Sequence, residues 1–122
     1  MMKQQTVEES IEQYIGAWNK TGADNIKAAL GKCWTVDSTY ADPNNAPTKG
    51  ADGLTALIEL SQKQMPGRRF SQASAPEFHH GSGCFRWRLT QKDGEAINGL
   101  DYFEYSSENQ ITRIVGFFDV LR

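Results

Sequence analysis

Cysteine and histidine are scarce in this chain of 122 residues, which contains two of each. Cys33 and Cys84 fall in different predicted elements and lack the spacing of metal ligands, so we expect reduced thiols in a cytoplasmic protein. His79 and His80 are neighbours, and on a strand their side chains would point to opposite faces, which argues against joint metal binding. Neither pair predicts a metal site, although one histidine could serve as a base or hydrogen-bond donor in a pocket.

An excess of charge and long apolar runs are also lacking. The formal net charge is −2, which gives no electrostatic footprint for nucleic acid or for an anionic membrane. No apolar run approaches the ~20 residues of a membrane span, and residues 1–9 lack the apolar core of a signal peptide. Glycine-rich phosphate loops, nucleophile elbows and metal motifs are missing too, so we expect no cofactor. From the net charge and the lack of long apolar runs, we expect no nucleic-acid or membrane partner.

The spacing of apolar residues before residue 66 is typical of helices. Thr6 and Glu9 form a capping box, in which each side chain meets a free backbone amide at a helix start. The apolar positions that follow recur at i, i+3, i+4 and i+7, which predicts a helix that ends at Gly22. The other elements predicted in this half are a helix at 24–31, a strand at 38–42, a proline-containing loop at 43–47 and a helix at 52–64.

Beyond residue 66 the apolar residues alternate, which is typical of strands. Phe85, Trp87 and Leu89 share one face of such a segment, and Lys-Asp-Gly at 92–94 is a hairpin signal. The predicted fold is a single α+β domain over residues 1–122, with three helices on the concave face of a strongly curved antiparallel sheet. The predicted strands are 70–78, bent or at an edge at its proline, and 83–91, 95–106 and 111–121.

The strand predicted at 95–106 carries aromatic or aliphatic residues on both faces. Leu100 and Tyr102 lie on one face, and Asp101 and Phe103 lie on the other. Helices can cover only one face of this sheet, so the other needs a different cover. We therefore predict a homodimer that forms through the outer face of the sheet.

The order of the elements is similar to the nuclear transport factor 2-like (NTF2-like) fold, and specifically to its SnoaL-like and ketosteroid isomerase-like branch. The resemblance covers nearly the whole chain and implies a cone-like, cystatin-like α+β fold with an aromatic-lined cavity for a small hydrophobic molecule. It is carried by a helix that ends near Trp18, Tyr-Ala-Asp-Pro at 40–43, Gly50 before the third helix, Gly-Leu-Asp at 99–101 and Ile-Val-Gly-Phe-Phe-Asp at 114–119.

Ketosteroid isomerases use a tyrosine on the first helix, an aspartate before a proline and an aspartate on a late strand. Tyr14, Asp42 and Asp101 occupy matching places here. The resemblance implies that Asp42 removes a proton α to a carbonyl while Tyr14 and a neutral Asp101 donate hydrogen bonds to the enolate. Simpler alternatives are core packing for Tyr14, a turn role for Asp42, and a salt bridge from Asp101 to Arg86 or Arg113.

The closing Phe-Phe-Asp at 117–119 also resembles limonene epoxide hydrolases, which have a catalytic aspartate near the end of the chain. That family needs an arginine and an aspartate two residues apart on an earlier strand, and the corresponding residues here are Arg86 and Arg88. Epoxide hydrolysis is not expected because the second acid is missing. These arginines, like Arg68 and Arg69, are predicted to be solvated or paired across strands, with an anion site as the alternative.

The aromatic residues predict the class of ligand, because they exceed what a small core requires. A remaining cavity would suit a hydrophobic ring-containing molecule of modest size. Two functions stay open: a cofactor-independent isomerase or polyketide cyclase-like enzyme that transfers a proton on a hydrophobic carbonyl compound, or a non-catalytic ligand-binding or protein-interaction module. The candidate ligand-binding residues are Trp18, Trp34, Phe70, Phe85, Trp87, Phe103 and Phe118.

Overall fold

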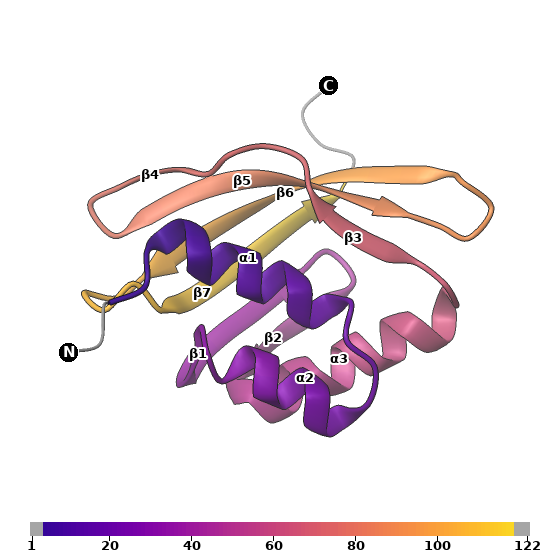
Figure 1. Ribbon diagram of the computed structural model, residues 1–122, viewed down its shortest axis with the longest axis horizontal. Helices are drawn as coiled ribbons and strands as arrows, with labels where there is room; N and C mark the ends of the chain where they lie inside the picture. The colour runs from indigo at the N-terminus through magenta and orange to yellow at the C-terminus, as the bar shows by residue number, and fades with distance from the viewer. Residues whose placement is uncertain (1–3, 119–122) are drawn as a thin grey trace.

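The computed structural model describes residues 4–118, which form three helices and a seven-stranded sheet (Figure 1). None of these helices has the length and apolarity of a membrane span. The helices are α1 (Val7–Trp18), α2 (Ala23–Leu30) and α3 (Gly50–Gln64). The strands are β1 (Trp34–Asp42), β2 (Asn45–Lys49), β3 (Arg69–Gln72), β4 (Glu77–His79), β5 (Ser82–Thr90), β6 (Ala96–Tyr105) and β7 (Ile111–Phe118).

The strands are ordered β2-β1-β7-β6-β5-β3, and β4 pairs with β5. The three helices lie together on one side of this curved sheet (Figure 1). The predicted fold class is confirmed: a curved sheet carries three helices in an α+β arrangement. One pairing differs from the expected antiparallel pattern, because β1 runs parallel to β7. This parallel pairing brings the first long strand of the chain beside the last.

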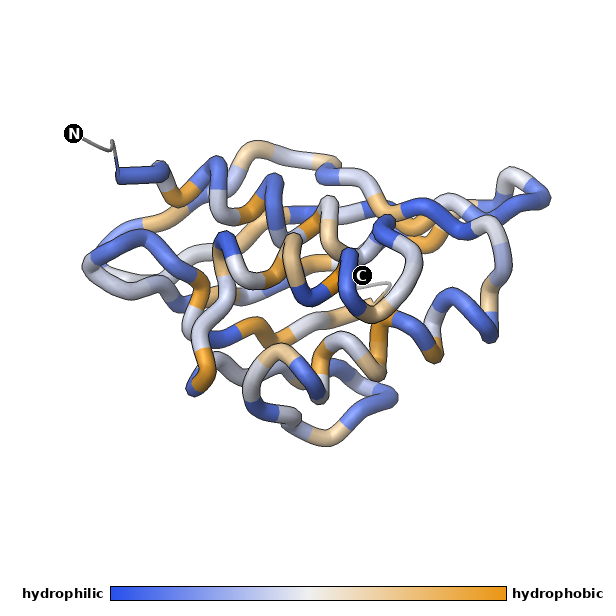
Figure 2. Tube along the Cα trace, turned by 60° about the horizontal axis from the view of Figure 1, so that its bottom comes forward, coloured by the Kyte–Doolittle hydropathy of each residue, from blue (hydrophilic) through white to orange (hydrophobic). Residues whose placement is uncertain are grey.

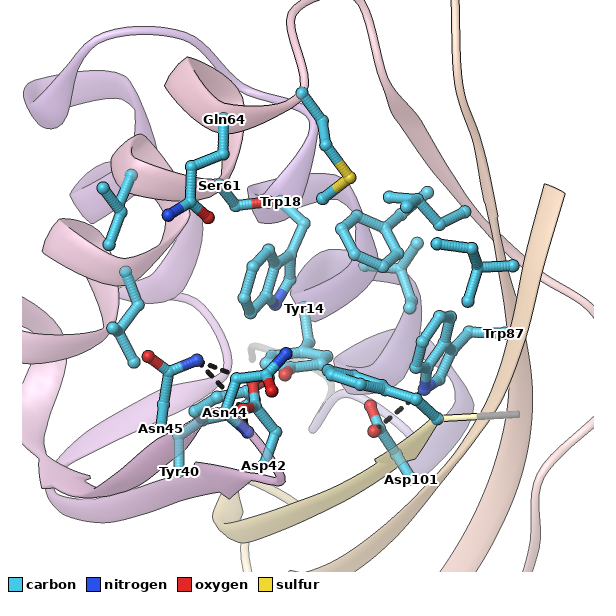
Figure 3. Close-up of a pocket in the computed structure, with 18 residues that line it drawn as sticks. Tyr14, Trp18, Tyr40, Asp42, Asn44, Asn45, Ser61, Gln64, Trp87 and Asp101 are labelled. Atoms are coloured by element: carbon cyan, nitrogen blue, oxygen red, sulfur yellow. Dashed lines mark hydrogen bonds between the residues drawn. The ribbon is translucent and has the colours of Figure 1, made fainter. Parts of the chain in front are cut away.

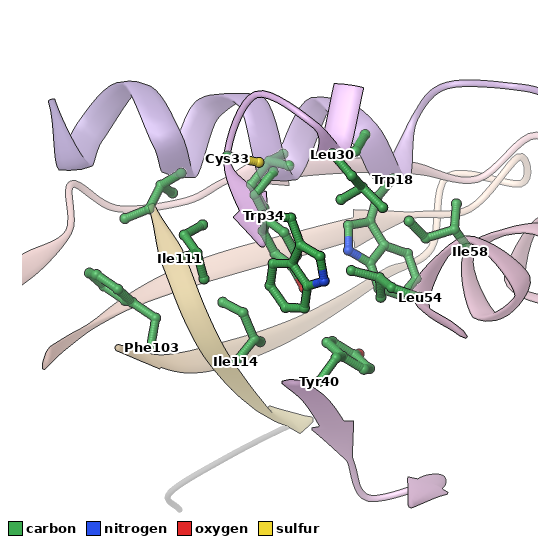
Figure 4. Close-up of a cluster of buried hydrophobic side chains, with 14 of the residues drawn as sticks. Trp18, Leu30, Cys33, Trp34, Tyr40, Leu54, Ile58, Phe103, Ile111 and Ile114 are labelled. Atoms are coloured by element: carbon green, nitrogen blue, oxygen red, sulfur yellow. The ribbon is translucent and has the colours of Figure 1, made fainter. Parts of the chain in front are cut away.

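The hydrophobic core fills the space between the helices and the sheet (Figure 4). Ile11, Leu54 and Ile114 are fully buried and come from α1, α3 and β7. Hydrophobic and hydrophilic residues are interspersed along the helices, as expected for helices with one buried face (Figure 2). The capping box at the start of α1 is confirmed, since Thr6 Oγ1 accepts from the Glu9 amide at 3.1 Å and Glu9 Oε1 accepts from the Thr6 amide at 2.9 Å.

The end of α1 is fixed against β3. The Asn19 side chain donates to the Phe70 carbonyl and accepts from the Phe70 amide, both at 2.8 Å. Arg68 donates to the Trp18 carbonyl at 2.5 Å, and its guanidinium carbon lies 4.9 Å from the centre of the Phe70 ring. These contacts fix Trp18 and Phe70 relative to each other, with ring centres 5.1 Å apart.

The loop predicted at 43–47 is wrong, because β2 begins at Asn45 and pairs with β1. Pro47 is tolerated because β2 is the edge strand, where one side of the backbone needs no partner. The strand predicted at 70–78 is divided into β3 and β4, which pair with different parts of β5. The predicted continuation of the last strand to 121 lies outside the described residues.

Gly16 in the middle of α1 offers a way to stabilise the fold. A Cβ added at this position would meet no atom within 4 Å. Glycine in a helix interior costs ~0.5–1 kcal/mol relative to alanine. We therefore expect Gly16→Ala to raise the free energy of unfolding by about that amount, as measured by urea denaturation. A decrease in the free energy of unfolding would show that the fold requires the absence of a side chain at Gly16.

Candidate functional site

A cavity of about 460 Å³ opens between α1, α3 and the inner face of the sheet (Figure 3). Its polar end is formed by Tyr14 of α1, Tyr40 and Asp42 of β1, and Asp101 of β6. Three of the four point inward because their strand or helix positions face the core: Tyr14, Tyr40 and Asp101 are at most 5 % exposed. The cavity therefore combines an apolar body with one cluster of ionisable groups.

Asp42 ends β1 and is held by three donors. Its Oδ1 accepts from the Asn44 amide at 2.8 Å and from Asn45 Nδ2 at 2.9 Å. Its Oδ2 accepts from the Tyr40 hydroxyl at 2.6 Å. The bond to the Asn44 amide is the turn contact that the sequence suggested as an alternative, and the same carboxylate also lines the cavity. Its orientation is thus fixed without loss of access to a ligand.

Asp101 is a buried acid without an ion pair among residues 4–118, and its side chain is 5 % exposed. The Trp87 indole N–H donates to Asp101 Oδ1 at 3.0 Å. Burial raises the pKa of Asp101 to about 8; the Trp87 hydrogen bond lowers it, and the charge of Asp42 raises it further. At neutral pH the carboxyl group is therefore mostly protonated and can donate a hydrogen bond.

The salt-bridge alternative for Asp101 has no support in the structure. Arg113 instead pairs with Glu104 at 3.4 Å, and Arg86 is exposed. Asp101 faces inward on β6, whereas its chain neighbours Leu100 and Tyr102 point to the outer face. The opposite orientation of adjacent residues on a strand separates this acid from the surface arginines.

Tyr14 remains a neutral hydroxyl donor. Its ring packs against Trp34, with ring centres 5.8 Å apart and planes 19° apart, so core packing is part of its role. Burial raises the pKa of Tyr14 well above its usual value, and the nearby carboxyl group of Asp101 raises it further. Burial likewise raises the pKa of Tyr40. Both phenols therefore keep their protons at neutral pH.

Gly116 of β7 allows the two carboxyl groups to approach one another. A Cβ at this position would lie 3.1 Å from Asp101 Oδ1 and 3.4 Å from the Cβ of Asp42. Asp101 pairs with Gly116 across β6 and β7, while the parallel β1 brings Ala41 opposite Val115. Residues from β1 and β6 thus meet over one glycine, and Figure 3 shows Tyr14, Asp42 and Asp101 around the same space.

Four of the predicted ligand-binding aromatics form one wall of the cavity. Trp18, Phe70, Trp87 and Phe118 all line it. Their rings follow one another in contact, with centres 5.1 Å, 5.4 Å and 5.6 Å apart along this series. Such edge-to-face contacts hold the rings in defined orientations and present a rigid apolar surface.

Trp34, Phe85 and Phe103 do not line this cavity but lie in the hydrophobic core. Phe85 shares a strand face with Trp87, yet it packs against Phe103 with ring centres 5.9 Å apart. Residue alternation shows which face of a strand a side chain occupies but not how far along that face the cavity extends. These three residues support the fold around the site.

Several lining residues were not predicted from the sequence. Tyr40 stands two residues before Asp42 on the same strand, and this spacing places both side chains on one face. Asn44 and Asn45 follow the proline turn, where side-chain amides readily reach a preceding carboxylate. The remaining unpredicted residues come from α3 and its end, and from β5 and β6: Leu57, Leu60, Ser61, Gln64, Met65, Leu89 and Ile97, with Ile15 of α1.

The other charged candidates lie outside the cavity. His79 and His80 are exposed on the β4–β5 turn, with their Nδ1 atoms 3.0 Å apart. Arg68 is buried, and it donates to Ser61 Oγ and to the carbonyls of Trp18 and Ile58. Within residues 4–118 there is no group of three or more histidine, cysteine, aspartate or glutamate side chains suited to a metal ion.

Comparison with known proteins relates this architecture to solved structures. No family profile and no curated protein sequence matches the chain. A proposed isomerase of the SnoaL-like family from Agrobacterium tumefaciens strain C58 superposes with a TM-score of 0.82 and 31 % identity, covering 92 % of this chain and 96 % of that one.

Two further structures share the fold at lower identity. A protein of ketosteroid isomerase-like fold from Catenulispora acidiphila, in complex with trimethylamine, has a TM-score of 0.75 and 13 % identity, covering 95 % of this chain and 88 % of its own. A proposed SnoaL-like polyketide cyclase from Jannaschia has a TM-score of 0.70 and 12 % identity, covering 98 % and 92 %.

Proposed function

Because this chain belongs to the SnoaL-like family, we propose that it is a cofactor-independent isomerase or cyclase that transfers a proton on a hydrophobic carbonyl compound. The observation that carries the proposal is the meeting of Tyr14, Asp42 and Asp101 at the polar end of one cavity. A binding site alone would need the cavity but would not need two carboxyl groups in different settings. The similar proteins described as a proposed isomerase and a proposed polyketide cyclase are consistent with this reaction class.

In the proposed reaction, Asp42 is the general base. Its carboxylate takes a proton from the carbon α to the substrate carbonyl, and the electron pair of the broken C–H bond moves into the enolate. Negative charge develops on the carbonyl oxygen, where Tyr14 and the protonated Asp101 donate hydrogen bonds. An isomerase then returns the proton from Asp42 to another carbon. In a cyclase the enolate carbon attacks a second carbonyl carbon of the same molecule, the π electrons of that C=O bond move to its oxygen, and this oxygen takes the proton from Asp42.

The two carboxyl groups divide these roles because their surroundings differ. Asp42 accepts hydrogen bonds from Tyr40, Asn44 and Asn45, which suits an ionised base. Asp101 is desolvated, and burial raises its pKa to about 8, which suits a neutral donor. Because Asp101 donates only while protonated, we propose that activity falls as the pH rises through about 8.

The charge of the cavity lining defines the ligand class. Among residues 4–118, no lysine, arginine or histidine lines the cavity, whereas Asp42 and Asp101 do. An anionic group on a ligand would be desolvated beside Asp42 with no positive partner, which is costly. The aromatic wall offers its surface to an apolar ring instead. We therefore propose an uncharged, ring-containing carbonyl compound as the ligand.

The direct test is proton exchange on a model substrate. The protein is incubated in D₂O with an uncharged cyclic β,γ-unsaturated ketone, and NMR follows deuterium uptake at the α carbon and formation of the conjugated isomer. The expected result is exchange well above the buffer rate. Saturable binding without any exchange would overturn the enzymatic proposal and favour the alternative, a non-catalytic ligand-binding module.

We also propose that the protein is a homodimer joined through the outer face of the sheet. Phe117 on β7 is 41 % exposed, and it pairs in register with Leu100 of β6. Tyr102 and Val115 are the next pair on that face. Light scattering at micromolar concentration should give twice the chain mass for the wild type and a lower mass for Phe117→Arg. A wild type of single-chain mass would contradict the proposal.

A further inference from the structure

The contact between Trp87 and Asp101 joins two buried polar groups. Each residue is 5 % exposed, and the indole N–H lies 3.0 Å from Asp101 Oδ1. The indole can only donate, and a protonated carboxyl group has one acceptor oxygen and one oxygen that carries the proton. Because the acceptor oxygen is the better partner for an N–H, a bond at Oδ1 leaves the proton on Oδ2. The contact thus determines which oxygen of the acid is the donor.

The indole of Trp87 is held in one orientation by its neighbours. Gly99 lies directly opposite Trp87 in the β5–β6 register, and a Cβ added at Gly99 would overlap the six-membered ring of the indole. Phe70 and Phe118 pack edge to face against Trp87, with ring centres 5.4 Å and 5.6 Å away. Gly99 and Asp101 are two residues apart, so one segment of β6 supplies both the space for the indole and the acceptor for its N–H.

The opposite side of the same carboxyl group is also restricted. Oδ1 lies beside Gly116, where an added Cβ would be only 3.1 Å away. Oδ1 is therefore enclosed by the Trp87 N–H and the backbone of β7. In Figure 3 the dashed line joins Trp87 to one oxygen of Asp101, and Tyr14 and Asp101 lie around the same space.

We propose that Trp87 is the positioning residue of the Asp101 acid: its N–H occupies Oδ1, so that Oδ2 carries the proton and donates it into the cavity beside the Tyr14 hydroxyl. The role of this hydrogen bond toward a ligand rests on the proposed function, but the position of the proton on Oδ2 does not. The carboxyl group would hold its proton in this way whether or not a reaction follows.

The titration of Asp101 can be distinguished from that of the ionisable groups that face it. Tyr14 faces it from α1, and Asp42 and Tyr40 face it from β1. The pKa of each tyrosine is raised, chiefly by burial, so both stay neutral through the range in which Asp101 ionises. Gly116 and Phe118 of β7 and Trp87 of β5 carry no ionisable group. Replacement of Asp101 itself identifies which carboxyl group is observed.

The test follows the three indole N–H signals by ¹H–¹⁵N NMR between pH 5 and 10 in the wild-type protein without ligand. The Trp87 signal is expected to move downfield with a midpoint near 8, since the hydrogen bond strengthens when Asp101 ionises. Trp34 is an internal control, because its N–H donates to the carbonyl of Gly50 at 3.2 Å and that acceptor does not titrate. In Asp101→Asn the Trp87 shift should be lost.

A Trp87 signal that does not titrate, or that still titrates in Asp101→Asn, would overturn the proposal. The wild-type NMR result does not depend on turnover. If the Trp87 signal titrates but the protein exchanges no substrate proton, the positioning role of Trp87 stands and the proposed enzymatic activity is wrong.

Two variants test the effect on Asp101 itself. Trp87→Phe keeps an aromatic ring but removes the N–H, and Gly99→Ala displaces the indole; Gly16→Ala is the matched control on α1. Loss of a donor to the carboxylate should raise the Asp101 pKa by roughly one unit, measured by carboxyl ¹³C NMR. The pH midpoint for binding of an uncharged cyclic ketone, which carries no titrating group, should rise equally. Loss of packing alone would weaken binding at every pH and leave the midpoint unchanged, which would contradict the proposal.

Discussion

Asp101→Asn should raise the melting temperature at pH 7 by roughly 10 °C, since it removes the cost of keeping an acid in a desolvated site. Burial raises the pKa of Asp101 to about 8, whereas an aspartate in an unfolded chain titrates near 4. Between these values the folded state holds a proton that the unfolded state has released. The contribution of Asp101 to stability should therefore be full below about pH 4 and fall by ~1.4 kcal/mol per pH unit until about pH 8.

The variant lacks this titration, so its advantage should grow with pH and reach roughly 2–4 kcal/mol at pH 7. Chemical denaturation of both proteins from pH 4 to pH 8 measures it. Glu104→Gln is the matched control on the same strand, because Glu104 lies on the outer face in a surface pair with Arg113, and such pairs contribute at most ~1 kcal/mol. A variant less stable than the wild type at neutral pH would mean that the Asp101 carboxylate has a favourable charged partner.

Asp42→Asn should lower kcat for the proposed proton transfer by roughly 10²–10⁴-fold, because an amide cannot accept the substrate proton. The single oxygen of the asparagine can still accept from the Asn44 amide, and the NH2 group in place of Oδ2 can donate to the Tyr40 hydroxyl. The turn should therefore persist, and ligand affinity should change little. Steady-state kinetics of ketone isomerisation, together with direct binding of a naphthol, separates kcat from affinity.

The matched control for Asp42→Asn is Asp37→Asn on the same strand. Asp37 is exposed, and its carboxylate lies 3.3 Å from Lys49 Nζ on the surface. It should leave both kcat and binding unchanged. If Asp42→Asn retains the wild-type rate, the base lies elsewhere and the role given to Asp42 is wrong.

The order of helices and strands could be predicted because each depends on local spacing. The Thr6–Glu9 capping box and the alternation around Trp87 involve residues close together in the chain. The strand β2 could not be predicted in the same way. Pro47 argues against a strand unless the segment is known to lie at a sheet edge, and edge position is a property of the whole topology.

The candidate site could likewise be predicted only in part from the sequence. Tyr14, Asp42 and Asp101 were placed by their motifs, and Tyr40 could have been added from its spacing to Asp42. The pairing of Trp87 with Asp101 depends on the register between β5 and β6 and on the missing side chain at Gly99. Hairpin sequences indicate a register only approximately, so cross-strand partners emerge from the folded sheet.

The parallel pairing of β1 with β7 has a consequence for how the protein is made. Ser38 donates to the Ile111 carbonyl at 2.7 Å across 73 positions of the chain, and Ile111 donates in turn to the Cys33 carbonyl at 2.8 Å. A chain emerging from the ribosome forms its helices and the β5–β6 hairpin early, because these need only nearby residues. Asp42 and Asp101 face each other only after Gly116 has arrived between them. The strand β7 is thus the one that completes the pocket, and a nascent chain cannot hold its ligand until β7 has been synthesised.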